Sequence, residues 1–183
     1  MIQKYFIAIV PPEPLLSKIQ EIKKTISQNY NTKGALRSPG HITLHMPFNW
    51  EEEKEVKLLS CLEAFKFDES FTITLEGFGS FEPRVVFITI KEENSLFLLQ
   101  KKIVQHVKAN LQLFNQSDSM RGFHPHITMA FRDLKKPIFY KIWEEYSSNS
   151  FQEKFNCQSI YLLKHVNDYW EVYKEFKFGV KKI

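Results

Sequence analysis

Hydrophobic positions along this chain recur with two different periods. Alternating apolar and polar residues, or short runs rich in β-branched and aromatic residues, predict strands, whereas apolar residues three and four positions apart predict amphipathic helices. The pattern predicts strands at residues 4–10, 41–48, 71–76, 84–91, 125–131, 159–165 and 169–178. It predicts helices at residues 15–30, 51–65, 96–111 and 137–147. This order of elements is typical of an α+β protein with two similar lobes.

Proline and glycine are expected to limit some of these elements. Met46-Pro47 is expected to end the second strand early, and Gly77 with Pro83 to interrupt the third. The last two strands predict a hairpin around residues 166–168. No Gly/Ser-rich linker or low-complexity segment separates the halves. We therefore expect a single domain covering residues 1–183, made of two intertwined lobes.

Composition narrows the class of protein. The 183 residues are 43% hydrophobic and 25% charged, which fits a globular chain and not a disordered one. The six glycines form neither of the two common phosphate-binding loops. The two cysteines, Cys61 and Cys157, fit no disulfide framework or metal knuckle and are expected to be buried. Without a signal peptide or a long apolar run, we expect a cytoplasmic monomer with no membrane association and no obligate protein partner.

A short internal repeat carries the candidate chemistry. His41-Ile42-Thr43-Leu44 recurs 85 residues later as His126-Ile127-Thr128-Met129. Side chains alternate faces along a strand, so each copy presents an imidazole and a hydroxyl on one face, about 7 Å apart. If the two lobes pack around a pseudo-twofold axis, two imidazoles and two hydroxyls converge on one groove.

This set of groups suits a phosphate ester. Hydroxyls can donate hydrogen bonds to the non-bridging oxygens, one neutral imidazole can accept a proton from an attacking water or hydroxyl, and an imidazolium can protonate the departing oxygen. Because the ordinary histidine pKa is about 6.5, both protonation states are accessible near neutrality. We expect neither a metal nor another cofactor to be needed.

Charge around the two motifs favours an anionic substrate. The net charge is only +4. However, residues 22–50 and 119–132 contain lysine and arginine but no aspartate or glutamate. Both motifs therefore lie in locally cationic stretches, which attract anions.

These motifs resemble the two H-x-[ST] motifs of the 2H phosphoesterase superfamily, in particular its 2'-5' RNA ligase-like branch, which includes RNA 2',3'-cyclic phosphodiesterases. Residues 5–12, 71–81, 84–90 and 160–163 are also similar to family segments. The resemblance implies a bilobal fold, with two antiparallel sheets and flanking helices around a central groove. It implies a metal-independent phosphoric diester hydrolase that converts the 2',3'-cyclic phosphate of RNA ends or nucleotides to a 2'-phosphate.

The resemblance also implies roles for the motif residues. His41 would be the proton donor and His126 the proton acceptor, while Thr43 and Thr128 would hold the phosphate oxygens. The partner would be RNA with a cyclic phosphate end or a small nucleotide substrate.

The sequence contains further candidates for substrate contact beyond the four motif residues. His45 shares the expected face of His41 and is either a groove residue or a packing residue. Arg132 falls on the face of His126 if that strand stays regular. Phe81, or Phe78 beside it, can stack on a nucleobase. Three arginines are candidate phosphate contacts or surface residues: Arg37, Arg84 and Arg121.

Two alternatives stay open at this point. The spacings His124-x-His126 and His41-x-x-x-His45 are compatible with zinc, although only Asp133 lies near to complete a site. A non-catalytic protein that binds an RNA end or a nucleotide phosphate is the other alternative. The pair of histidines favours an enzyme, because binding alone can use lysine or arginine.

Overall fold

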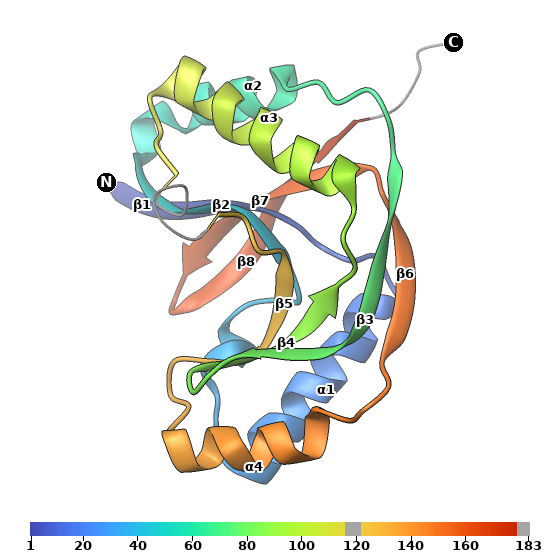
Figure 1. Cartoon of the computed structure of the whole chain (residues 1–183). Helices are drawn as coiled ribbons and strands as arrows, with labels where there is room; N and C mark the ends of the chain where they lie inside the picture. Colours follow the sequence, from blue (N-terminus) through green and yellow to red (C-terminus); the bar gives the residue numbers. More distant parts are fainter. Residues whose placement is uncertain (116–121, 179–183) are drawn as a thin grey trace.

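The computed structural model describes residues 1–115 and 122–178 (Figure 1). The strands are β1 (Ile2–Ile9), β2 (Ile42–Glu51), β3 (Phe71–Phe81), β4 (Val85–Ile90), β5 (His126–Ala130), β6 (Gln152–Cys157), β7 (Ser159–Val166) and β8 (Tyr169–Lys177). The α-helices are α1 (Leu15–Tyr30), α2 (Glu55–Ala64), α3 (Asn94–Leu111) and α4 (Lys136–Tyr146), with 3-10 turns η1 (Gly34–Arg37) and η2 (Glu52–Lys54). All predicted elements are present, and β6 is an additional strand.

The described strands form one antiparallel sheet in the order β6-β3-β4-β5-β2-β1-β7-β8. In the middle of this order, β2 and β5 meet through the pair Ile42 and Ile127. This seam divides the sheet into two four-stranded halves. The expected pair of separate sheets is not confirmed, because the seam pair joins both halves into one curled sheet (Figure 1).

The helices pack across the two halves. Helix α1 lies between β1 and β2 in sequence but packs against β5, while α3 precedes β5 but packs against β2. Helix α4 packs against β4, and α2 against α3. Each half-sheet is thus covered by a helix whose neighbours in the sequence are strands of the other half. Both halves share one hydrophobic core.

Strand β2 does not end at Met46-Pro47, contrary to the prediction, but continues to Glu51. Thr43 pairs with Ala8, whereas His45 pairs with Ile7, so β2 carries one extra residue at this point. Such a β-bulge lets a strand continue while it shifts the alternation of side chains by one position.

Strand β3 likewise continues through the glycine segment, so the predicted interruption is wrong. Leu75 pairs with Ile90 and Phe78 with Ile88, again with one extra residue in β3. Gly77 adopts φ +67° inside this bulge, a conformation that glycine reaches without a steric penalty. The glycine that suggested a break therefore supplies the bulge that keeps the strand paired.

The predicted hairpin between β7 and β8 is confirmed. Asn167 and Asp168 both adopt positive φ, as a two-residue type I′ turn requires. Cys61 and Cys157 are buried and free, as expected. Among the described helices, none has both the length and the apolar character needed to cross a membrane.

Candidate functional site

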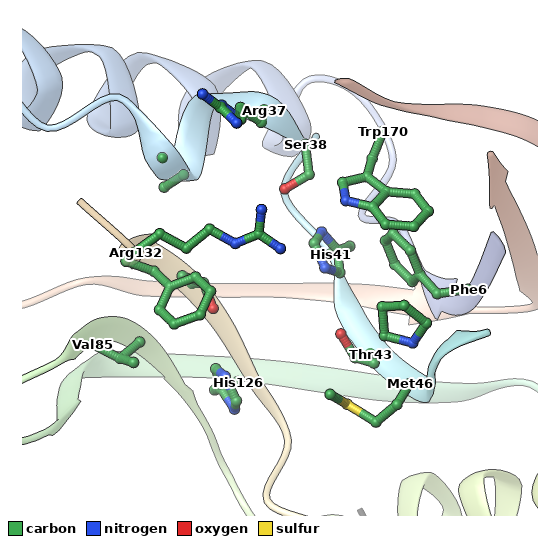
Figure 2. A pocket seen from close by; sticks show the side chains of 15 residues that line it. Phe6, Arg37, Ser38, His41, Thr43, Met46, Val85, His126, Arg132 and Trp170 are labelled. Carbon is green, nitrogen blue, oxygen red and sulfur yellow. The ribbon is translucent and has the colours of Figure 1, made fainter. Parts of the chain in front are cut away.

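The seam between β2 and β5 brings the two His-x-Thr motifs together. The antiparallel pair Ile42 and Ile127 lies at the centre of both motifs, since each isoleucine stands between the histidine and the threonine of its own motif. Both isoleucines are fully buried, so the motif side chains project from the other face of the sheet. That face opens into a pocket of about 340 Å³ (Figure 2). Four motif residues line it: His41, Thr43, His126 and Thr128.

Both histidines are oriented in the same way by the backbone. The Nδ1 atom of His41 lies 2.7 Å from the carbonyl oxygen of Pro39, and Nδ1 of His126 lies 2.7 Å from that of His124. A carbonyl oxygen only accepts hydrogen bonds, so Nδ1 carries the hydrogen in each ring. When either ring is neutral, its Nε2 atom is the proton acceptor.

A phenylalanine backs each imidazole. The Phe6 ring lies 4.8 Å from the His41 ring and the Phe87 ring 4.9 Å from the His126 ring. These phenylalanines are only 3% and 4% exposed. Each histidine therefore has an apolar wall, which disfavours the charged form of the ring.

Burial accordingly lowers the pKa of both histidines. It lowers the pKa of His41 to about 4; the hydrogen bond to Pro39 opposes this shift, and the charges of Lys23 and His126 add to it. Burial also lowers the pKa of His126, against the effect of its hydrogen bond to His124. Both rings are therefore neutral at pH 7 in the unliganded protein.

Apart from Ser38, the remaining pocket walls are apolar or cationic. The other lining residues are Phe6, Gly34, Ala35, Arg37, Ser38, Met46, Pro47, Val85, Phe131, Arg132 and Trp170. No aspartate or glutamate occurs among these described lining residues. In Figure 2 the Arg132 side chain extends across the pocket toward Ser38 and His41. A pocket with two arginines and no carboxylate suits an anionic ligand.

Comparison with known proteins agrees with this geometry. Residues 11–169 match the 2'-5' RNA ligase superfamily. The chain belongs to this family. It is also 30% identical over 154 residues to an RNA 2',3'-cyclic phosphodiesterase of Archaeoglobus fulgidus, a match that covers 82% of this chain and 84% of that protein.

Solved structures share the fold. E. coli LigT complexed with 3'-AMP has a TM-score of 0.68 at 21% identity, covering 98% of this chain and 100% of LigT. The protein TT0787 of Thermus thermophilus has a TM-score of 0.68 at 20% identity, covering 96% of this chain and 98% of TT0787. The resemblance to the 2H phosphoesterases is thus confirmed, and the chain is an enzyme of the phosphodiesterase class.

Of the two interpretations of His45 in this 2H phosphoesterase, the structure supports the packing residue and not the groove residue. His45 is 1% exposed and is not among the pocket residues. The bulge in β2 pairs it with Ile7, so it faces the core, where its ring packs 5.3 Å from that of Phe48. Strand parity fails here because it assumes an unbroken alternation. Met46 and Pro47 line the pocket instead.

Some of the other candidate contacts line the pocket and others do not. Arg37 and Arg132 line the pocket, whereas the exposed Arg84 lies in the turn between β3 and β4 and does not. Phe81 is not a lining residue, but it is 40% exposed and its ring lies 5.2 Å from that of His126. Arg121 lies outside the described residues.

The histidine spacings considered for zinc do not form a metal-binding cluster. His41 faces the pocket and His45 the core, so these two rings lie on opposite faces of β2. Within residues 1–115 and 122–178, no group of three or more His, Cys, Asp or Glu side chains could hold a metal ion.

Some residues in or beside the pocket were not singled out from the sequence, among them Phe6, Trp170 and Lys23. Phe6 and Trp170 come from β1 and β8, and their rings lie 4.7 Å apart at the His41 side of the pocket. Lys23, 2% exposed on α1, lies behind the loop that leads to His41. Its signal in the sequence is its place on the apolar stripe of α1, four residues after Ile19.

Proposed function

We propose that this 2H phosphoesterase hydrolyses the 2',3'-cyclic phosphate of an RNA end or a nucleotide to a 2'-phosphate. The observation that carries the proposal is the seam, where two His-x-Thr motifs face one pocket that contains two arginines and no carboxylate. The name of the Archaeoglobus fulgidus relative, an RNA 2',3'-cyclic phosphodiesterase, supports the choice of substrate.

In the proposed reaction, the oxygen of a water molecule attacks phosphorus while His126 accepts a proton from that water. The bond between phosphorus and the 3' oxygen breaks, and the His41 imidazolium donates its Nε2 proton to this oxygen. The products are a 2'-phosphate and a free 3' hydroxyl. Thr43 and Thr128 donate hydrogen bonds to the non-bridging oxygens. Proton exchange with solvent then restores both histidines.

The substrate must bring about the protonation of His41. Burial lowers the pKa of this residue to about 4, so the unliganded ring is neutral at pH 7. A phosphate anion next to Nε2 favours the charged imidazolium and raises that pKa. Substrate binding at neutral pH is therefore coupled to proton uptake in the proposed mechanism.

The pocket and the ligands of LigT support a ligand of nucleotide size. LigT has been crystallised with 3'-AMP, ATP and NADP+, all of which are adenine nucleotides. A pocket of about 340 Å³ with Trp170, Phe131 and Met46 in its walls is compatible with a nucleotide of this kind.

The cytoplasmic location and the monomeric state stay predictions from the sequence.

Phosphorus NMR of a 2',3'-cyclic mononucleotide tests this function. Incubation with the protein is expected to convert the cyclic phosphate signal to that of the 2'-phosphate, which is distinct from the 3'-phosphate. His41→Ala and His126→Ala are expected to prevent the conversion. A shifted cyclic phosphate signal without product would instead indicate a non-catalytic binding protein.

A further inference from the structure

The segment that leads from α1 to His41 forms one wall of the pocket. Gly34, Ala35, Arg37 and Ser38 all line the pocket. The carbonyl of Pro39 then fixes the ring of His41. The position of this segment therefore affects both the wall and one of the two imidazoles.

Asp133 holds the first part of this segment. Its carboxylate accepts hydrogen bonds from Thr32 Oγ1 at 2.6 Å, from the Lys33 amide at 2.6 Å and from the Gly34 amide at 3.1 Å. Burial acts to raise the pKa of Asp133, but these hydrogen bonds outweigh it and lower that pKa. The carboxylate is thus charged at neutral pH, as a strong acceptor should be.

The Asp133 contact also brings the loop after β5 close to η1. A Cβ atom added to Gly34 would lie 2.3 Å from the Phe131 carbonyl oxygen, so only glycine permits this approach. Between Phe131 and Asp133, Arg132 adopts φ +71°, a conformation that is unfavourable for a non-glycine residue and persists only where its surroundings enforce it. Asp133 is next to Arg132 in the chain. The hydrogen bonds of Asp133 therefore also fix the backbone of Arg132, from which the Arg132 guanidinium reaches the pocket.

Lys23 holds the second part of the segment. Its Nζ atom donates hydrogen bonds to the carbonyl oxygens of Ala35 at 3.1 Å and Ser38 at 3.0 Å. The side chain is buried, so few other groups can satisfy these carbonyls. The carbonyl that orients His41 belongs to Pro39, the residue after Ser38.

We propose that Asp133 and Lys23 are positioning residues of the phosphate site: Asp133 sets Arg132 for phosphate binding, and Lys23 sets the Pro39 carbonyl and thereby His41. This inference rests on the proposed function, because it assigns the pocket to a phosphate ester. Neither side chain is among the residues that line the pocket, so both act through other residues.

The first test is Asp133→Asn, which turns an acceptor oxygen into a donor amide facing backbone N–H groups. We expect KM for a 2',3'-cyclic mononucleotide to rise about tenfold, with kcat changed less than about threefold. In an Arg132→Ala background the same change should alter KM by less than about twofold. A KM effect of equal size in both backgrounds would overturn the role assigned to Asp133. Asp68→Asn, in an exposed loop, is the matched control.

The second test is Lys23→Met, which keeps the length and removes the donors and the positive charge. Burial lowers the pKa of Lys23 to about 7, so this charge is complete only on the acid side of neutrality. We expect kcat to fall about tenfold. Loss of the positive charge near His41 should raise the pKa of that ring, while His126 and the pocket arginines remain. The acid limb of kcat/KM should therefore also move to higher pH. Lys24→Met, at an exposed position paired with Glu21, should change neither quantity. Loss of kcat with an unmoved acid limb would overturn the role of Lys23.

If Lys23→Met does not fold, Lys23→Gln retains a donor without charge and is expected to move the same limb of the kcat/KM profile.

Phosphate binding separates this inference from the proposed function. Binding of inorganic phosphate, followed through the NMR signals of His41 and His126, needs no turnover. If the wild-type protein cleaves no cyclic phosphate, the proposed function fails. Independently of turnover, the positioning role of Asp133 also fails if Asp133→Asn binds inorganic phosphate as tightly as the wild type.

Discussion

The two halves of the site have the same skeleton but different surroundings. On each side a histidine precedes a strand-borne threonine, uses Nδ1 on a carbonyl two residues earlier, and packs on a phenylalanine. Around His41 lie the buried Lys23 and the ring of Trp170 behind Phe6. Around His126 lie the exposed ring of Phe81 and the ring of His124. The repeat sets the geometry, and the surroundings set how readily each imidazole takes a proton.

Removing either imidazole is the largest expected change. His41→Ala and His126→Ala should each lower kcat by about 10²–10⁴-fold, because each removes one proton transfer. The double variant should lose little more than either single variant, since the two groups act as a unit. Initial rates on a 2',3'-cyclic mononucleotide, with thermal unfolding as the control for the fold, measure this. Substantial turnover in one single variant would show that the halves do not share the reaction.

The threonines are expected to contribute less, and about equally. Thr43→Ala and Thr128→Ala should each lower kcat/KM by about 10–100-fold, the effect of one hydrogen bond to a charged group. Thr43→Ser and Thr128→Ser keep the hydroxyl and should retain most of the activity. A large loss in one half and none in the other would mean that the phosphate is held asymmetrically.

The pH dependence distinguishes the surroundings of the two histidines. The unliganded pKa is about 4 for His41 and is lowered for His126, and catalysis requires one charged and one neutral ring. The profile of kcat/KM should therefore be bell-shaped and lie below about pH 6.5, the ordinary histidine pKa. The profile of kcat should lie at higher pH, because bound phosphate raises both pKa values. Limbs at the same pH in both profiles would contradict the proton uptake proposed for substrate binding.

Chelation is the smallest expected effect. Addition of EDTA should leave the rate unchanged, since neither half of the proposed mechanism uses a metal. Rates before and after dialysis against EDTA, and after addition of zinc, measure this. Loss of activity that zinc restores would require a different role for the histidines.

The sequence predicted what is local and missed what depends on pairing. Alternation within each motif gave the face of His41 and of Thr43, because two residues on one strand need no partner to set their direction. It failed at His45, since the bulge appears only when β2 is aligned with β1. The pairing of Ile42 with Ile127 joins residues far apart in the chain, and no local period encodes it.

Two further misses have similar causes. Strand β6 mixes polar and charged residues with the buried Phe155 and Cys157, and it becomes a strand by pairing with β3 at the edge of the sheet. Lys23 lies on the apolar stripe of α1, where its two acceptor carbonyls come from the following loop. In both cases tertiary partners override the local preference of the residue.

The crossed packing of α1 on β5 and of α3 on β2 has a consequence for how this enzyme can be divided. A polypeptide that ended after α2 would hold α1 without the strand that α1 covers, and the complementary fragment would hold α3 without β2. Each fragment alone would expose the apolar face of its helix to water. Turnover from two such fragments would thus depend on their association, as in a split reporter.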